Sequence, residues 1–215
     1  MKTFKIYSLI IVFFFSLSVF NIAHADCNIS DKSALMGKDL AGCNLQDADL
    51  RGANLEGANL RDANLIFANL EGANLRDAVL EVANLSGAYL EGANLTRADL
   101  ERADLTAANL TRAYLTGANL RDADLRGTNL EGAYLTDAKL EGADLRDAYF
   151  GGADLYRADL RGAKLEGADL RDADLRVTNL EGAYLTDAKL EGANFEGATW
   201  VDGRTCGDKS IGQCL

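Results

Sequence analysis

An apolar residue recurs at every fifth position from Leu40 to Phe195, which makes 32 consecutive units without an insertion. The central residue is leucine in every unit except two, where it is phenylalanine. An α-helix repeats about every 3.6 residues and a strand every second residue, so neither brings residues five apart to one interior. The chain is therefore expected to bend once in every unit.

The other positions of the unit are equally regular. The residue two before the centre is alanine in 28 of the 32 units, and one large plus one small apolar residue suits a narrow core. The residue directly before the centre is Asn or Asp in 23 units. Two positions after the centre, Gly, Asp and Arg predominate, as a corner with unusual backbone angles requires. No proline interrupts a backbone ladder between coils.

This pattern, A-[DN]-L-x-x, resembles the motif of the pentapeptide repeat family, and it covers about 160 of the 190 residues after residue 25. The resemblance implies an all-β, right-handed quadrilateral β-helix with four pentapeptides per square coil. The units then form about eight coils, a rod roughly 38 Å long at a spacing of roughly 4.8 Å. We expect the solenoid at 38–198, an N-terminal cap at 26–38 and a C-terminal cap at 199–215, with Trp200 closing the shaft.

The first 25 residues have the features of a secretory signal. MKTFK is a basic start, an apolar run of fifteen follows, and Ala23-His24-Ala25 has the small-x-small pattern of a signal peptidase site. The apolar run is short for a transmembrane helix. We expect cleavage after Ala25, no membrane insertion of the mature chain, and a secreted or periplasmic location.

The charge and the histidine content exclude several classes of function. The formal net charge is −11, and it becomes −13 when Lys2 and Lys5 leave with the signal. Such a surface repels phosphates and anionic lipids, so no nucleic-acid partner is expected. The only histidine, His24, also leaves, which removes imidazole as a general base, triad member or zinc ligand. No catalytic residue and no cofactor are predicted.

Four cysteines lie in pairs near the two ends of the expected rod. Joining residues of opposite ends would require a disulfide across roughly 38 Å, whereas the Cα atoms must lie within about 7 Å. We therefore predict the disulfides Cys27–Cys43 and Cys206–Cys214. The alternative for Cys43, which occupies an inward alanine position, is a buried free thiol.

Residues twenty apart are expected to stack in columns. One column is charged and mostly alternates in sign, which favours a ladder of salt bridges: Arg61, Glu81, Glu101, Arg121, Glu141, Arg161 and Glu181. A second holds Asp104, Asp124 and Asp144, a weak candidate site for a hard cation such as Ca²⁺ unless Arg126 and Arg146 neutralise it. Tyr114 and Tyr134 form a third, either a stabilising ladder or a platform for a sugar or a partner side chain.

Two further features concern partners. Ile66, Phe67, Val79 and Val82 are apolar at outward positions within one coil's length, which makes them the candidate contact patch for a protein. The segment TNLEGAYLTDAKLEGA occurs at 128–143 and again at 178–193. The offset of fifty residues is two and a half coils, so the copies lie on opposite faces.

Three functions remain open from the sequence. The first is a non-catalytic, secreted or periplasmic scaffold that binds an unidentified protein. The second follows from the family resemblance: some members mimic DNA and protect topoisomerases from quinolones or toxins, which fits the acidic charge but not the signal. The third is a glycosidase-like enzyme that uses paired carboxylates, although residues on regular faces lie in no cleft where burial raises a pKa.

Overall fold

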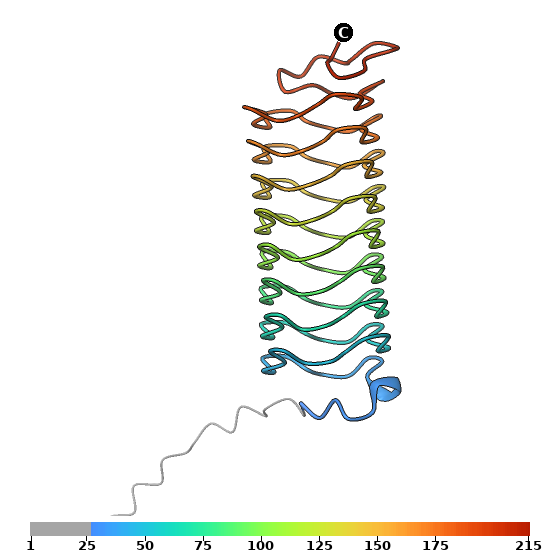
Figure 1. Ribbon diagram of the computed structural model, residues 1–215, viewed down its shortest axis with the longest axis vertical. Helices are drawn as coiled ribbons and strands as arrows, with labels where there is room; N and C mark the ends of the chain where they lie inside the picture. Colours follow the sequence, from blue (N-terminus) through green and yellow to red (C-terminus); the bar gives the residue numbers. More distant parts are fainter. Residues whose placement is uncertain (1–26) are drawn as a thin grey trace, which may run out of the picture.

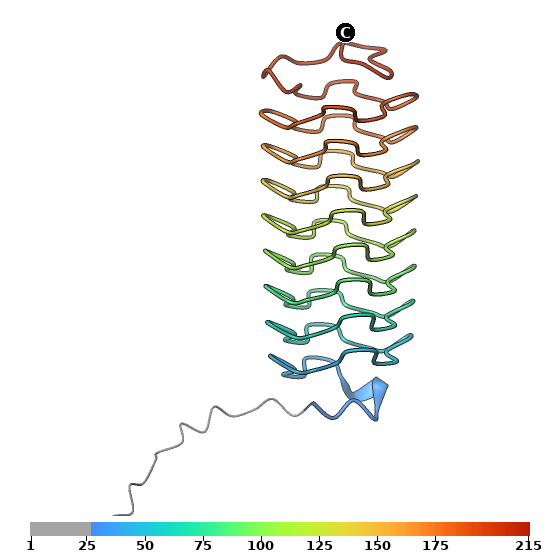
Figure 2. The same cartoon turned by 60° about the vertical axis from the view of Figure 1, so that its left-hand side comes forward.

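The computed structural model describes residues 27–215, and the expected signal peptide lies outside the described residues. These residues form a straight rod of stacked coils with the N-terminal segment at one end and the C-terminus at the other (Figure 1). In the view of Figure 2 the same kinks recur at the same place in every coil. The one helical element of the described part is the 3₁₀ helix η1, Lys32–Ala34.

Parallel bridges join neighbouring coils at single residues. Each residue directly before a unit centre pairs with the residue twenty further on, from Asp39 with Asn59 up to Asn179 with Thr199. Twenty residues are four pentapeptides, so four units complete one coil, and the series spans eight coils. The predicted quadrilateral β-helix is confirmed, with strand pairing limited to isolated bridges.

In a covered shaft unit with Asn or Asp before its centre, every backbone N–H group finds an acceptor, as the burial of a narrow coil demands. In the unit 118–122 the five groups donate, in chain order, to the carbonyl oxygens of Leu115, Ala98 and Lys139, to Oδ1 of Asn119 and to the carbonyl oxygen of Glu141, at 2.7–3.4 Å. Two of these bonds stay within the coil and three reach its neighbours. The side chain of Asn119 supplies one of the two local acceptors, which explains why Asn and Asp dominate this position.

The residue two after each centre forms the corner. Its φ is positive throughout the shaft, for example 62° at Gly92 and 55° at Asp122. A positive φ suits glycine and is tolerated by Asp. The predicted requirement for unusual corner angles is therefore confirmed, but Phe67, Val82 and Val177 also occupy corners, at 53°, 61° and 60°.

The core runs along the axis of the rod without a break. The centre leucines from Leu50 to Leu180 are fully buried, as is Phe150, and the alanines two before them line the same interior. Thr128 and Thr178 replace alanine in two units, and their hydroxyls donate to the carbonyl oxygens of Leu105 (2.8 Å) and Leu175 (2.6 Å). The hydroxyl of each threonine is therefore satisfied inside an apolar shaft.

The N-terminal cap begins the pentapeptide geometry one unit earlier than expected. Leu35 is buried at a centre position, and Gly37 takes a corner with φ 62°. Asp31 caps η1 by accepting a hydrogen bond from the backbone N–H of Ser33 at 3.0 Å. A disulfide joins Cys27 to Cys43, as predicted, with 5.5 Å between the Cα atoms.

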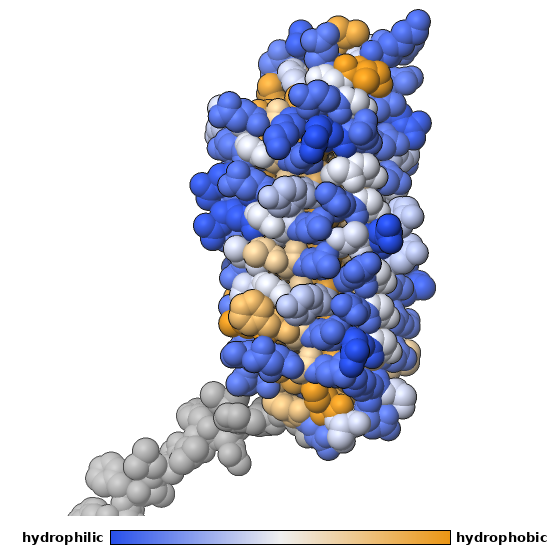
Figure 3. Space-filling model, in the orientation of Figure 1, coloured by the Kyte–Doolittle hydropathy of each residue, from blue (hydrophilic) through white to orange (hydrophobic). Residues whose placement is uncertain are grey.

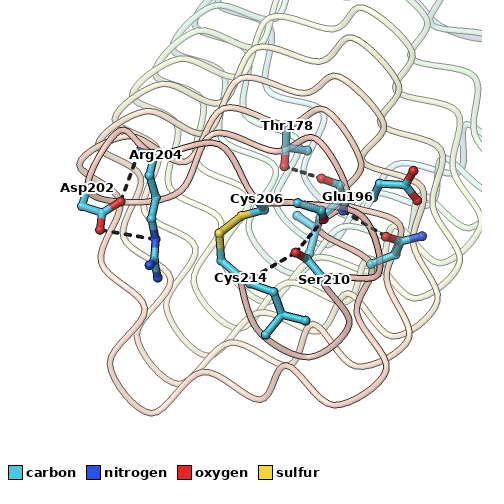
Figure 4. Close-up of a disulfide and its surroundings, with 11 residues drawn as sticks. Thr178, Glu196, Asp202, Arg204, Cys206, Ser210 and Cys214 are labelled. Carbon is cyan, nitrogen blue, oxygen red and sulfur yellow. Dashed lines mark hydrogen bonds and ion pairs between the residues drawn. A yellow bond between two sulfur atoms is a disulfide. The ribbon is translucent and has the colours of Figure 1, made fainter.

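The C-terminal cap folds back over the last coil instead of continuing it. Antiparallel bridges pair Asn194 with Ile211 and Thr199 with Thr205. Trp200 lies half-buried at the end of the shaft, with its ring edge-on to Phe195 at 5.1 Å between centroids. The second predicted disulfide, Cys206–Cys214, holds the returning segment (Figure 4).

Candidate protein-binding surface

In the expected contact patch, Phe67 and Val82 occupy two adjacent corners of the shaft, Ile66 directly precedes one of these corners, and Val79 lies on the side that leads to the other. We call these four residues the corner surface. Phe67 is 54% exposed and Val82 is 44% exposed, while Ile66 and Val79 are half-buried. The face seen in Figure 3 is largely hydrophilic, with hydrophobic residues singly or in small groups. Exposed aromatic and aliphatic side chains within one coil's length therefore stand out from their surroundings.

The ring of Phe67 lies over the corner of the next coil. That corner is Gly87, and a Cβ atom there would lie 2.3 Å from Cε1 of Phe67. A larger residue at position 87 would have to displace the ring. Sequence reasoning missed this pairing, although a glycine twenty residues after an outward phenylalanine was its signal.

Val82 holds a backbone conformation that disfavours it. Its φ of 61° is left-handed, which costs a β-branched residue roughly 1–2 kcal/mol. Glu81 beside it accepts from Arg102 at 2.6 Å and also pairs with Arg61. Ion-paired side chains therefore flank Val82 directly, and charged groups next to apolar contact residues are common in protein interfaces.

The charged column is a salt-bridge ladder only in part. Glu141 lies between two arginines, at 2.7 Å from Arg121 and 3.2 Å from Arg161. Where the sign does not alternate, between Glu81 and Glu101, Arg102 of the neighbouring corner position supplies the positive charge. The column therefore acts as a network on one face and not as a simple alternation.

Two of the three aspartates in the column, Asp124 and Asp144, are neutralised by arginines of their own units. Arg126 and Arg146 each contact the aspartate two residues earlier, Asp124 and Asp144, at 2.6 Å. These hydrogen bonds hold the pKa of both carboxyl groups below the usual range. Asp104 accepts from the backbone N–H of Thr106 at 2.9 Å. Within residues 27–215 no group of three His, Cys, Asp or Glu side chains is placed to hold a metal ion.

Tyr114 and Tyr134 stack as predicted, with 5.1 Å between ring centroids and 9° between the planes. Parallel bridges place Asn94 and Asp154 on either side of the pair along the same column. Because the rings stack on each other, each covers a face of the other. The stacking supplies the stabilising ladder. With Tyr114 and Tyr134 49% and 44% exposed, the platform for a sugar or a partner side chain stays a prediction.

The titrations of the acidic groups also bear on catalysis. In the described part of the chain, every carboxyl group whose pKa is displaced has it lowered, chiefly by hydrogen bonds, as at Asp49, Asp144 and Asp174. A general acid of the glycosidase kind needs a raised pKa.

No helix between residues 27 and 215 is long and apolar enough to cross a membrane.

Four five-residue units in each turn of a hydrogen-bonded coil define a pentapeptide-type β-solenoid. The chain belongs to the pentapeptide repeat family. The family model, described as pentapeptide repeats, matches in eight copies over residues 39–77, 83–122, 113–152, 138–176 and 163–199. A comparison with curated protein sequences found no match.

Solved structures of the same family resemble the rod. HetL, a pentapeptide repeat protein involved in the regulation of heterocyst differentiation in the cyanobacterium Nostoc sp. strain PCC 7120, is 35% identical, with 78% of this chain and 91% of that chain covered and a TM-score of 0.51. Another pentapeptide repeat protein of Nostoc, alr5209, is 44% identical over 39% of this chain and 64% of its own, with a TM-score of 0.29. QnrB1, a plasmid-mediated fluoroquinolone resistance protein, is 20% identical over 78% of this chain and 75% of its own, with a TM-score of 0.42, and no shared function follows from such a likeness.

Proposed function

We propose that the protein is a non-catalytic scaffold, exported to the periplasm or beyond, that binds a protein partner through the corner surface. The observation that carries the proposal is the exposure of Phe67 and Val82 at left-handed corners, where most other units have Gly, Asp or Arg. An apolar residue kept at a strained and exposed position weakens the fold. Such residues concentrate where they serve binding.

A scaffold role also agrees with the chemistry of the rest of the shaft. Asp124 and Asp144 are ion-paired, and their lowered pKa values make them poor proton donors at neutral pH. No histidine occurs after His24, so neither a triad nor an imidazole base is available in residues 27–215. We therefore expect the scaffold to recognise its partner protein by shape, apolar contact and charge.

Export is supported by the signal-like start and by the disulfide in each cap, because such bonds persist in oxidising compartments. N-terminal sequencing of the protein from cell fractions tests it. We expect a chain that begins at Asp26 in the periplasmic or secreted fraction. A full-length cytoplasmic protein with four free thiols would contradict export.

The binding proposal is tested by affinity capture with three immobilised proteins: the wild type, the double variant Phe67→Asp/Val82→Asp, and the control Val177→Asp. Val177 is matched to Val82 because it is 50% exposed at a corner with φ 60°. We expect the wild type and the control to retain one specific partner from the exported fraction and the double variant to lose it. Equal retention by all three would exclude the corner surface as the binding site.

A further inference from the structure

The C-terminal cap covers only part of the last coil. The backbone N–H of Phe195 donates to Ser210 (2.8 Å), that of Gly197 to Cys206 (3.1 Å), and that of Gly212 to Ala193 (2.8 Å). The preceding stretch, 183–192, lies on other sides of the same coil and has no complete coil above it. The cap approaches only its end, where a Cβ atom at Gly212 would lie 3.5 Å from the carbonyl oxygen of Leu190. Its residues Leu185, Ala188 and Leu190 are half-buried, whereas the shaft has fully buried leucine and alanine at these positions.

The chain contains an identical copy of this stretch in a covered environment. Residues 133–142 have the same sequence as residues 183–192, within the repeated segments 128–143 and 178–193. In the covered copy four N–H groups donate to the next coil at 2.6–3.0 Å, those of Leu135, Asp137, Leu140 and Gly142, and the carbonyl oxygens of Ala133 and Ala138 accept at 2.9 Å. All six bonds are made with residues 154–161 of the covering coil.

The six corresponding groups of the C-terminal copy have no hydrogen-bond partner within residues 27–215. They are the N–H groups of Leu185, Asp187, Leu190 and Gly192 and the carbonyl oxygens of Ala183 and Ala188. A row of unpaired donors and acceptors on a sheet edge is a template for a further strand. We call residues 183–192 the open edge.

Charge distinguishes the kind of strand that the open edge fits. In the covered copy, Arg157 contacts Asp137 at 2.9 Å and Arg161 contacts Glu141 at 3.2 Å. The equivalent acids on the open edge are Asp187 and Glu191, and neither has a basic side chain within ion-pair distance in the described part of the chain. In the covered copy, the strand above therefore contributes two arginines, four residues apart, that pair with Asp137 and Glu141. Within the described residues, no such arginines face Asp187 and Glu191 on the open edge.

We infer that the open edge binds an extended segment of a partner protein by parallel β-augmentation. The segment presents small and leucine-sized residues to Leu185 and Leu190 and two arginines, four residues apart, to Asp187 and Glu191, as residues 153–162 do for the covered copy. A groove between the edge and the cap, lined by Ala188, Leu190, Ile211 and Gly212, receives the apolar side chains. The inference rests on the proposed scaffold role but uses a surface separate from the corner surface.

The probe is a fluorescent peptide with the sequence of residues 151–164, GGADLYRADLRGAK, added to the disulfide-bonded protein. We expect saturable binding by anisotropy and slower hydrogen exchange at the amides of Leu185, Asp187, Leu190 and Gly192. The amides of the covered copy should be protected with or without the peptide. A peptide with both arginines replaced by glutamate should bind at least about tenfold more weakly, because like charges then meet across the edge.

Matched variants separate this site from others. Asp187→Arg should weaken peptide binding about tenfold, while Asp137→Arg, the same change in the covered copy, should leave it unchanged. Both positions are left-handed corners, with φ 59° and 57°, and arginine occupies equivalent corners elsewhere in the shaft. Phe67→Asp should retain peptide binding even where it abolishes partner capture, so the two proposals fail separately.

Three results would overturn the inference. One is the absence of saturable binding at millimolar peptide. Another is protection that appears on amides outside the open edge. The third is protection of the same four amides before any peptide is added, because a second copy of the chain would then occupy the edge.

Discussion

Within a unit, the place of a residue decides how much a substitution there costs. Leu120 is fully buried at a centre position, whereas Arg126 is exposed and pairs with Asp124. Leu120→Asp should lower the free energy of unfolding by several kcal/mol, because it buries a carboxylate without a partner. Arg126→Ala removes one exposed ion pair and should cost under about 1 kcal/mol. Urea unfolding measures both, and equal midpoints would contradict the assignment of inward and outward positions.

The inward and outward sides of each unit were predictable because the period alone determines them. The pairing of outward charges was less so. Stacking in columns suggested contacts between coils, yet Arg126 and Arg146 contact aspartates two residues earlier in their own units. The residues directly before and after a centre both point outward from the same coil. An ion pair within one unit therefore competes with an ion pair between neighbouring coils. The ring of Phe67 over Gly87 depends on a rotamer, which a repeat pattern does not determine.

In the two caps the five-residue repeat ends, and a disulfide in each cap holds the chain where the repeating ladder does not. The Cys206–Cys214 disulfide closes a short loop, and its loss typically costs about 2–4 kcal/mol. Cys206→Ser/Cys214→Ser should therefore release the returning segment and speed hydrogen exchange at Phe195 and Gly197, whose amides donate to it. The amide of Leu120 in the middle of the shaft should be unaffected. Uniformly faster exchange along the rod would mean that the cap and the shaft unfold as one unit.

The two caps also show where sequence reasoning ends. Cysteine spacing was enough to predict both disulfides, since the rod separates the two pairs. The return of residues 204–211 as an antiparallel partner was not predictable, because this segment has no repeat and one sequence fits many turns. For the same reason, the sequence did not predict that the cap covers only part of the last coil and leaves the open edge.

For the whole molecule, we expect low pH to be the condition that weakens the electrostatic stabilisation of the fold most. The pKa values of Asp124, Asp144 and Asp174 are lowered, chiefly by hydrogen bonds from arginine side chains. A carboxyl group with a lower pKa in the folded state stabilises the fold above its unfolded pKa, and this stabilisation is lost as pH falls through the folded value. The melting temperature should therefore be flat from pH 8 to pH 5, where no histidine titrates in residues 27–215, and fall below about pH 4.

Salt provides the control for this prediction. The arginine partners are exposed, so about 1 M NaCl should weaken their ion pairs and reduce the acid-sensitive part of the stability. Calorimetry across pH at low and high salt measures both effects. A melting temperature that changes between pH 5 and pH 8, or one that is insensitive to acid, would contradict the assignment to these carboxylates.

Because each unit satisfies its own corner and passes the same ladder to the next coil, the rod has no preferred total length. Adding one pentapeptide in the middle of the shaft would keep the backbone ladder and the leucine core. It would change only the side-chain columns that cross the insertion and rotate everything beyond it by a quarter turn about the axis. The angle about the rod axis between the open edge and the corner surface is thus set by the number of units between them. Gain or loss of single units would let evolution re-aim two binding surfaces without altering a residue in either.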